Sequence, residues 1–534
     1  MKHETAETSL PYGGAGRRVA PVILLSLILT LAAGLRFYGI QRDSLWTDEF
    51  LTLELSTSRG LTESIMPRDQ IAVNPPHPTG LRDAPPWWRG WRAMDTDTHP
   101  PLHPMLLRFW RETFGEGDFA ARSLSAVLSL LGVVFLFLAV RLVSGTSTGL
   151  WAALVMAVAP AQIDYAQFAR SYSMLVTTVG GCCAAAVWVF VRGPSPWRCA
   201  VLGISMLIAM LTHYTAAGPL AGLALFLLLR GDQSLRKRVL LTVAVAAFVW
   251  TVIWGPVAFR QRGNFEDLVG WTREGSAGHL ARTLLRLARL PMRYFFEPKE
   301  RGESVAALGA ILYVAPLLLV RRKPVWLMWW LVLIGAVLPV LIADLRRTSN
   351  LLAHLRYTIG GSVAVYAMVA AVGDFLGARL NGSEPAARWS RVLSIAAPLT
   401  VAIACLLTLP DFYSRRQPDF RDFGEFIAAH VSKNDLIVFE PAPEGAPWAP
   451  DILELAITHY ADGAPCAMVI LSREHDAAIL SAIRDRAASS RGNIWLINSG
   501  TAGRGADIFG SGAKQLDAHY FHAVARVARI SISN

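Results

Sequence analysis

The chain has 534 residues, of which 53% are hydrophobic and only 17% are charged, and its formal net charge is +11. Soluble globular proteins usually carry about 25% charged residues, so this composition argues against a soluble protein, and apolar stretches of roughly 18 or more residues indicate a polytopic membrane protein. Because the Lys and Arg residues lie mostly in short loops, the positive charge indicates membrane topology, and no nucleic-acid partner is expected.

Hydropathy predicts about eleven apolar spans, at 19–39, 121–142, 149–163, 171–191, 199–211, 215–229, 239–259, 305–320, 325–342, 357–376 and 392–409. We expect the first to be an uncleaved helix, because it is long for a signal peptide. Every second loop is basic, with Arg17, Arg18, Arg141, Arg192, Arg198, Arg230, Arg236, Lys237, Arg238, Arg321, Arg322, Lys323, Arg379, Arg388 and Arg391. Basic short loops stay inside the cell, so the N-terminus is predicted to be cytoplasmic.

The other loops are then outside, and two of them are long, at 40–119 and 260–304. The first contains tryptophans mixed with arginines, which suits a membrane interface. Residues 103–114 and 280–290 each combine apolar and charged residues at helical spacing. Both are predicted to be amphipathic helices that lie along the membrane surface.

The composition becomes that of a soluble protein from about residue 414. Predicted helices at 420–431, 452–460 and 477–488 alternate with predicted strands at 436–439, 468–471 and 494–497. This alternation is typical of a small α/β domain. The expected organisation is therefore a multi-span membrane domain at 1–413 and a soluble extracytoplasmic α/β domain at 414–534.

Five polar clusters lie at the ends of the spans, and the predicted topology places all of them on the outer face. They are Trp46-Thr47-Asp48-Glu49, the motif at 97–102, the motif at 167–170, Thr212-His213-Tyr214 and Leu355-Arg356-Tyr357. Acids, histidines and arginines that gather at one water–lipid boundary suggest a site for a charged, lipid-linked substrate.

The acidic clusters suggest specific chemistry. Asp48 and Glu49 could accept a proton from an attacking hydroxyl, or help hold a cation. The alternative is an ordinary pair of loop acids. His99 could bind phosphate when protonated or a metal when neutral, and Asp97 could share that cation. Here the alternative is a proline-rich turn with solvated acids.

The remaining clusters are basic. Arg170 lies between two tyrosines, and arginine binds phosphate through two parallel hydrogen bonds, although it could equally anchor the helix at the interface. Arg356 breaks the positive-inside trend, which an anionic lipid phosphate would explain. A single histidine such as His213 is more often structural than a ligand.

The sequence has no Walker loop or dinucleotide fingerprint. An enzyme that faces outward has no cytosolic nucleotide sugar available, so its donor would be a sugar on a membrane lipid phosphate. The rival class is a transporter or flippase. Transporters keep charges near the bilayer midplane, often in repeated halves, whereas these charges lie at span ends and no internal repeat is apparent.

The motifs SLWTDE at 44–49, DTHPPL at 97–102 and APAQIDYAQFARSY at 159–172 resemble bacterial GT-C glycosyltransferases of the protein-mannosyltransferase superfamily, related to the aminoarabinose transferases of lipid A. His213 and Arg356 with their neighbours fit the same pattern, and DFRDF at 419–423 resembles the tail domain often attached. Each motif alone is weak, but the ordered set is fairly specific and covers nearly the whole chain.

The resemblance implies an inner-membrane enzyme with an outward-facing site. It would transfer a sugar from a polyprenyl phosphate to a cell-envelope lipid, glycan or protein, with inversion. Asp48 would be the base and Glu49 its support. The donor phosphate would contact His99, Arg170 and Arg356. A divalent cation is the one candidate cofactor, because some relatives bind one near this site, and its candidate ligands are Asp97 and His213.

The chain departs from the family pattern at two positions. Thr47 stands where relatives usually carry an aromatic residue, and Phe168 stands where they usually carry Glu. The second departure suggests a different cation requirement or acceptor. It also leaves open a non-catalytic relative that binds a sugar lipid without transferring it.

Overall fold

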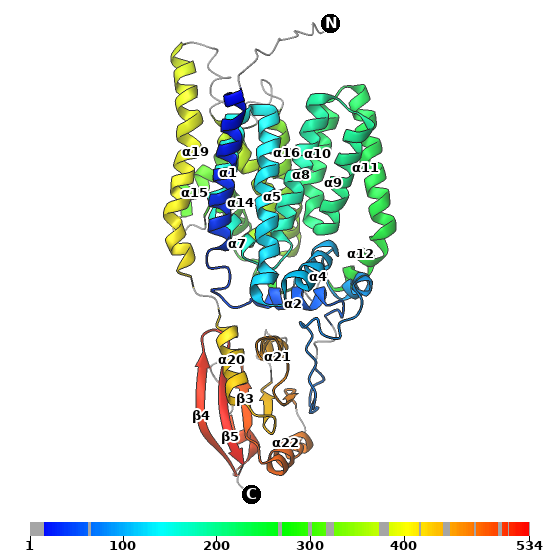
Figure 1. Ribbon diagram of the computed structural model, residues 1–534, viewed down its shortest axis with the longest axis vertical. Coiled ribbons are helices and arrows are strands. Elements are labelled where there is room, and N and C mark those ends of the chain that lie inside the picture. The colour runs from blue at the N-terminus through cyan, green and yellow to red at the C-terminus, as the bar shows by residue number, and fades with distance from the viewer. Residues whose placement is uncertain are drawn as a thin grey trace.

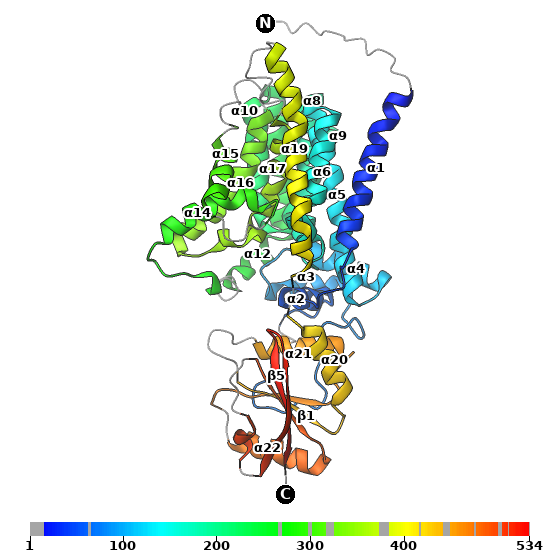
Figure 2. The ribbon, with the colours of Figure 1, turned by 90° about the vertical axis from the view of Figure 1, so that its left-hand side faces the viewer.

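The computed structural model describes residues 15–61, 66–264, 270–296, 302–314, 316, 325–372, 384–415, 418–441, 449–474, 477–499, 505–510 and 512–532. A bundle of apolar helices makes up one part of the molecule, and a small sheet with its helices makes up the other (Figure 1). The helix α1 (Ala15–Phe37) begins at the end of the bundle that is farther from the sheet (Figure 2).

The bundle contains helices that coincide with all of the predicted spans. They are α1 (Ala15–Phe37), α5 (Asp118–Ser144), α6 (Thr146–Val158), α7 (Pro160–Ala166), α8 (Tyr172–Arg192), α9 (Pro196–Thr212), α10 (Ala217–Arg230), α11 (Gln233–Ile253), α12 (Gly255–Gln261), α15 (Gly302–Val314), α16 (Val325–Arg347), α17 (Ser362–Ala370) and α19 (Glu384–Tyr413). Parts of two predicted spans, 315, 317–320 and 373–376, and the residues Arg321, Arg322, Lys323 and Arg379 lie outside the described residues.

Within the described ranges, five helices are long and apolar enough to cross a membrane, or seven if two bent pairs each count as one span. The bent pairs are α6 with α7 and α11 with α12, and α9, α10 and α17 are shorter apolar helices. The predicted fold class, a polytopic helical membrane protein with a small C-terminal α/β part, is confirmed.

The bend of 62° between α6 and α7 has a chemical cause. Pro160 has no amide hydrogen, and its ring clashes with the carbonyl four residues earlier. Fully buried Arg36 of α1 satisfies the carbonyls that the break leaves open, because its guanidinium donates to the oxygen of Ala157 at 2.8 Å and of Met156 at 3.3 Å. The broken span brings the segment after α7, which carries Arg170, to the end of the bundle.

Two helices of the bundle touch through their backbones. A Cβ atom added to Gly218 of α10 would lie 1.9 Å from the carbonyl oxygen of Gly335 in α16, and one added to Gly222 would lie 2.2 Å from that of Leu331. Small residues allow such close approach between membrane helices. Glycine is therefore required at these positions.

Short helices cover the end of the bundle that faces the sheet (Figures 1 and 2). They include α2 (Thr47–Ser56), α3 (Gly90–Ala93) and α4 (Leu102–Phe114). The 3-10 turns of this region are η1 (Trp87–Arg89), η2 (Met94–Thr96), η3 (Tyr214–Ala216), η4 (Arg262–Asn264), η5 (Gly270–Thr272), η7 (Leu351–Ala353), η8 (Leu355–Tyr357) and η9 (Ile359–Gly361). The helix α14 (His279–Arg293) packs at the side of the bundle against α15 and α16. The helices α4 and α14 form where the sequence predicts amphipathic helices.

The C-terminal part contains α20 (Phe420–His430), β1 (Leu436–Phe439), α21 (Ala449–Tyr460), β2 (Ala467–Ile470), α22 (Ala477–Ser490), β3 (Ile494–Asn498), the turn η10 (Gly505–Phe509), β4 (Ala513–Phe521) and β5 (Ala525–Ile532). The strand order is β2-β1-β3-β5-β4, with β1 parallel to β2 and β3, and β5 antiparallel to β3 and β4. The three predicted strands are present, and β4 and β5 extend the sheet beyond the sequence prediction.

The first long loop of the chain pairs with the edge of this sheet. The amides of Asp69 and Ala72 donate to the carbonyls of Ile470 and Met468 in β2, and the amide of Met468 donates back to Ala72. Arg68 forms an ion pair with Asp451 of α21 at 2.8 Å. An open sheet edge is a template for unwanted pairing, so this loop both covers the edge and ties the sheet to the bundle.

Candidate active site

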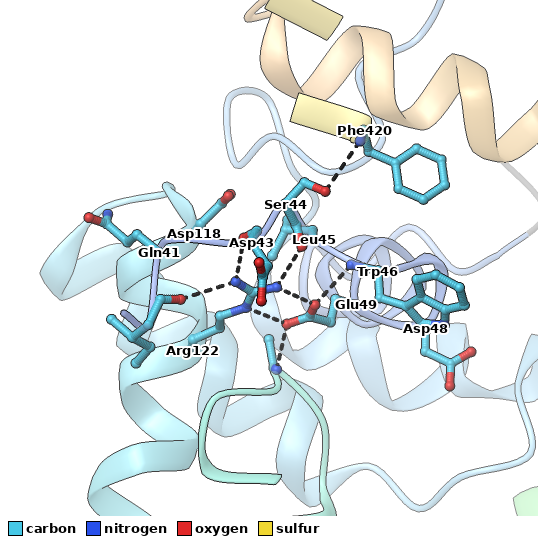
Figure 3. Close-up of polar contacts among 12 residues, drawn as sticks. Gln41, Asp43, Ser44, Leu45, Trp46, Asp48, Glu49, Asp118, Arg122 and Phe420 are labelled. Carbon is cyan, nitrogen blue, oxygen red and sulfur yellow. Dashed lines mark hydrogen bonds and ion pairs between the residues drawn. The ribbon is translucent and has the colours of Figure 1, made fainter. Parts of the chain in front are cut away.

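The first turn of α2 carries the acid pair, and the two side chains point in different directions (Figure 3). The helix begins directly after Trp46, whose amide donates to Glu49 Oε2 at 2.9 Å. Acids in a first turn are favourable, because they pair with open amides and with the helix dipole. Successive residues of a helix are rotated by about 100°. Glu49 is accordingly fully buried, whereas the Asp48 side chain is 23% exposed.

Every partner of Glu49 belongs to the protein itself. Arg122 of α5 donates from Nε to Oε1 at 2.8 Å and from Nη2 to Oε2 at 2.7 Å, and the amide of Ala169 donates to Oε1 at 2.8 Å. The same guanidinium also donates to the carbonyls of Ile40, Asp43 and Ser44. Glu49 thus joins α2, α5 and the segment that carries Arg170. These contacts fix the helical turn that carries Asp48.

Asp48 faces a cation from the far end of the sequence. Its Oδ2 accepts a hydrogen bond from Nη1 of Arg356 in η8 at 2.7 Å. The guanidinium of Arg356 also lies 5.4 Å from the ring centre of Trp271 and 5.3 Å from that of Tyr357. Two aromatic faces and one carboxylate therefore hold the Arg356 side chain beside Asp48.

Arg170 lies on the other side of the α2 turn. It is buried, and its Nη1 donates to Thr52 Oγ1 at 2.7 Å and to the carbonyl of Asp48 at 3.2 Å. Its guanidinium carbon lies 6.0 Å from the ring centre of Tyr172. Among the described residues, the buried Arg170 Nε has no hydrogen-bond partner. A buried donor without a partner is unfavourable, so Arg170 retains a donor that an anionic ligand could satisfy.

Asp97 and the histidines complete the group. Asp97 is buried, and its carboxylate lies 3.1 and 3.2 Å from His99 Nδ1. Burial favours a raised pKa for Asp97, but His99 and Arg170 outweigh it, and the pKa is lowered. The ring of His99 lies 5.3 Å from that of His213. Burial and the nearby His99 and Arg170 lower the pKa of His213 well below its usual range.

The side chains predicted to bind a divalent cation have other partners in the structure. The Asp97 carboxylate faces His99, and the Asp48 carboxylate faces Arg356. His213 Nδ1 accepts from the amide of Thr215 at 3.2 Å, and a neutral imidazole that accepts at Nδ1 carries its proton on Nε2. No group of three His, Cys, Asp or Glu side chains within the described ranges could hold a metal ion. These residues do not fit a divalent cation.

All five polar clusters predicted from the sequence therefore meet at one end of the bundle. The sequence did not predict two residues of this region. Trp271 packs against the Arg356 guanidinium, and Arg122 forms the ion pair with Glu49. An arginine at the start of an apolar span is a usable signal, because such a residue needs a partner. Phe168 stacks on Tyr172 at 6.3 Å, so an apolar ring occupies the position where the family pattern has Glu.

Comparison with known proteins connects this geometry to a family. Residues 98–254 match the family described as dolichyl-phosphate-mannose-protein mannosyltransferase. The crystal structure of ArnT from Cupriavidus metallidurans in the apo state matches with a TM-score of 0.53 and 15% identity, over 96% of this chain and 98% of that chain. The family match covers part of the membrane domain, and the chain shares the fold of ArnT over nearly its whole length.

Two further solved structures match with lower TM-scores. ArnT bound to undecaprenyl phosphate matches with a TM-score of 0.45 and 15% identity, over 97% of this chain and 98% of that chain. The Archaeoglobus fulgidus oligosaccharyltransferase tethered with an acceptor peptide matches with a TM-score of 0.49 and 14% identity, over 90% of this chain and 69% of that chain. No curated protein sequence matches. The family match contains His99, Arg170 and His213, while Asp48 and Arg356 lie outside it.

Proposed function

We propose that this GT-C protein transfers a sugar from a polyprenyl phosphate to a hydroxyl group of a cell-envelope acceptor, with inversion at the anomeric carbon. The observation that carries the proposal is the contact of 2.7 Å between Asp48 and Arg356, with Arg170 against the same turn of α2. This arrangement sets one carboxylate beside two guanidiniums. It provides a base for the acceptor and cations for a departing phosphate.

In the proposed reaction, the acceptor oxygen attacks the anomeric carbon while Asp48 accepts its proton. The bond between that carbon and the phosphate oxygen breaks, and both electrons leave with the lipid phosphate. Arg356, Arg170 and His99 stabilise the developing charge. The attacking and leaving groups lie on opposite faces of the sugar, which gives inversion. A donor phosphate would compete with Asp48 for Arg356 and so release the carboxylate to act as a base.

The proposed topology follows the basic loops. The junction of α10 with α11 lies at the same end of the bundle as the start of α1, and the sheet lies at the opposite end (Figure 1). We infer that the first end is cytoplasmic, because the loops predicted there are basic. Residues 414–534 and the site would then lie outside, at the plasma membrane, beyond a membrane domain formed by residues 1–413.

The test is sugar transfer by the purified full chain in lipid nanodiscs. A panel of polyprenyl-phosphate sugars is offered with envelope lipids, glycans and proteins as acceptors, and the anomeric configuration of the product is read by NMR. Loss of a general base typically lowers a rate by about 10²–10⁴-fold, and this loss is expected for Asp48→Asn. Asp43→Asn, at a nearby partly exposed acid, is the matched control.

Unchanged turnover in Asp48→Asn would refute the proposal. Donor binding without transfer across the whole panel would instead indicate the non-catalytic relative, and movement of the lipid between leaflets without transfer would indicate a flippase.

A further inference from the structure

A cavity of about 580 Å³ lies where the first loop and the α4–α5 junction meet α20 and α21. Its lining includes His77, Thr79, Glu116, Asp118, Glu425 and Asp462. The volume is in the usual range for sites that bind small ligands. None of the residues proposed to take part in transfer lines it. In Figure 3, Gln41 and Asp118 of the lining lie on one side of the Glu49–Arg122 pair and Asp48 lies on the other.

One wall of the cavity is built from elements that are distant in sequence. Buried Asp118, at the start of α5, accepts from Arg421 Nη2 at 2.6 Å, from Tyr460 Oη at 3.0 Å and from His459 Nε2 at 3.2 Å. His459 Nδ1 lies 3.2 Å from the hydroxyl of Thr79. These contacts join the first loop, α5, α20 and α21. The wall is therefore held in place before any ligand binds.

The charges of the lining point to the kind of ligand. It has four carboxylates, Glu116, Asp118, Glu425 and Asp462, but only two guanidiniums, Arg111 and Arg421. Both guanidiniums already donate to the protein through their terminal nitrogens, while the buried Nε of Arg111 has no hydrogen-bond partner among the described residues. Arg421 donates to Asp118 and to the carbonyls of Gln41 and Asp43, and Arg111 donates to the carbonyls of Thr79 and Leu53 and to the Ser56 hydroxyl.

Two of the carboxylates are open to a ligand. Glu425 and Asp462 are exposed, and neither forms a hydrogen bond or ion pair with another described residue. Ionised carboxylates accept hydrogen bonds and cannot donate them. The lining therefore disfavours phosphates and acidic sugars, and it favours ligands that are rich in hydroxyl or ammonium groups.

We propose that this cavity binds a neutral or positively charged saccharide of the acceptor. Hydroxyl groups of the sugar donate to Glu425 and Asp462, and the wall around Asp118 fixes its position. The assignment to the acceptor rests on the proposed function, whereas saccharide binding itself does not. Because the cavity and Asp48 are separated by the Glu49–Arg122 pair, the bound saccharide is remote from the reacting hydroxyl. Binding energy from such a remote group can help to orient the reacting centre.

Gly117 provides a variant that fills the cavity. It lines the cavity as the residue before α5, its backbone is extended with φ −71° and ψ 170°, and an added Cβ would meet no atom within 4 Å. Gly117→Phe should therefore fold, which thermal unfolding checks, and place a ring in the cavity. Gly117→Ser is the matched control, because serine is favoured immediately before a helix.

Binding is measured by isothermal titration calorimetry on the full chain in nanodiscs. The probes are a glucosamine trisaccharide, its N-acetylated form and trigalacturonic acid. We expect the first to bind most tightly, the second to bind more weakly and the third not to bind. Gly117→Phe should lower the affinity at least tenfold, whereas Gly117→Ser and Asp48→Asn should leave it unchanged.

Two further variants test the charge argument. The double variant Glu425→Gln with Asp462→Asn should lower the affinity for the glucosamine probe more than the affinity for the N-acetylated probe. Asp422→Asn, at an exposed acid of α20 outside the lining, should change neither affinity. The proposal is overturned if neither of the first two probes binds, if trigalacturonic acid binds as tightly, or if Gly117→Phe leaves the affinity unchanged. These outcomes are independent of the transfer rate of Asp48→Asn, so the two proposals can fail separately.

Discussion

At the scale of single residues, neighbouring acids have different surroundings. Asp48 is partly exposed and faces Arg356. Glu49 is buried and accepts four hydrogen bonds, two from Arg122 and one each from the amides of Trp46 and Ala169. Glu49 therefore has no accessible lone pair for a substrate. These contacts fix the helix that carries Asp48, the base in the proposed reaction.

This difference predicts opposite effects of substitution. Removing one partner of a buried ion pair costs about 3–5 kcal/mol, so Glu49→Gln should lower the free energy of unfolding by about that amount, because it leaves Arg122 buried without its counter-charge. Asp48→Asn should leave stability nearly unchanged while it removes transfer. Thermal unfolding in detergent checks both. The double variant Glu49→Leu with Arg122→Met should recover part of the lost stability, and a stable Glu49→Gln would contradict this account.

Arg356 allows a second prediction at this scale. Loss of a group that stabilises transition-state charge typically lowers turnover by about 10²–10³-fold, and this is expected for Arg356→Met. The turnover of Arg356→Lys should lie between those of the wild type and Arg356→Met. An ammonium keeps the charge, but it lacks the planar geometry that contacts both phosphate and aromatic faces. Steady-state kinetics with the polyprenyl-phosphate sugar provide kcat and KM. Equal rates for Lys and Met would show that the charge of Arg356 has no role.

At the scale of elements, the broken span α6–α7 connects the bundle to the site. Pro160 ends α6, and Arg36 and Gln167 bind the carbonyls at the ends of α6 and α1. The segment that follows α7 contains Ala169 and Arg170, whose contacts with α2 shape the site. The hydrogen bonds that buried Arg36 donates within the described residues are accepted by backbone carbonyls and by the Ser129 hydroxyl.

This arrangement predicts that Arg36→Met is destabilising although it keeps the helix apolar. An unsatisfied buried polar group costs about 1–3 kcal/mol, and the substitution leaves the carbonyls of Met156 and Ala157 without their donor. Both the unfolding temperature and the transfer rate should fall, because the position of Arg170 depends on α7. Arg141→Met, at an exposed arginine near the end of α5, is the control. Full activity with unchanged stability in Arg36→Met would contradict this role.

At the scale of the whole molecule, α21 of the C-terminal part packs against α2 of the bundle. Glu454 of α21 is fully buried there, and its carboxylate oxygens have no hydrogen-bond partner among the described residues. Burial, together with the nearby Glu54 and Asp451, raises the pKa of Glu454 well above its usual range. Asp451 itself is paired with Arg68. The neutral form of Glu454 is therefore the one that suits the interface.

The sign of the pH dependence follows from this raised pKa. The folded protein binds the Glu454 proton more tightly than the unfolded chain, so the contribution to stability is complete below the unfolded pKa and is lost as the pH rises through the folded pKa. Glu454→Gln should remove this dependence. Its unfolding temperature should match that of the wild type near pH 4 and exceed it near pH 9. If the unfolding temperatures of the two proteins change in parallel between pH 4 and pH 9, the prediction is wrong.

The sequence by itself determined the properties that depend on local pattern. Apolar stretches predicted the spans, loop charge predicted their alternation, and the polar clusters at span ends predicted which residues gather in one region. Helices and strands of the C-terminal part followed from periodicity at 420–497. The pattern was insufficient for β4 and β5, where β4 is largely exposed and arginines interrupt the apolar positions of β5.

Only the tertiary structure decided which partner each polar side chain takes. Asp48 meets Arg356 across 308 residues and Glu49 meets Arg122 across 73, while the loop around Arg68 and Ala72 covers an edge strand almost 400 residues later. The physical reason is that the hydrophobic effect depends on composition and spacing, which a sequence shows directly. A hydrogen bond or ion pair requires two groups within about 3 Å in a suitable orientation, and only the packing of the whole chain sets that distance.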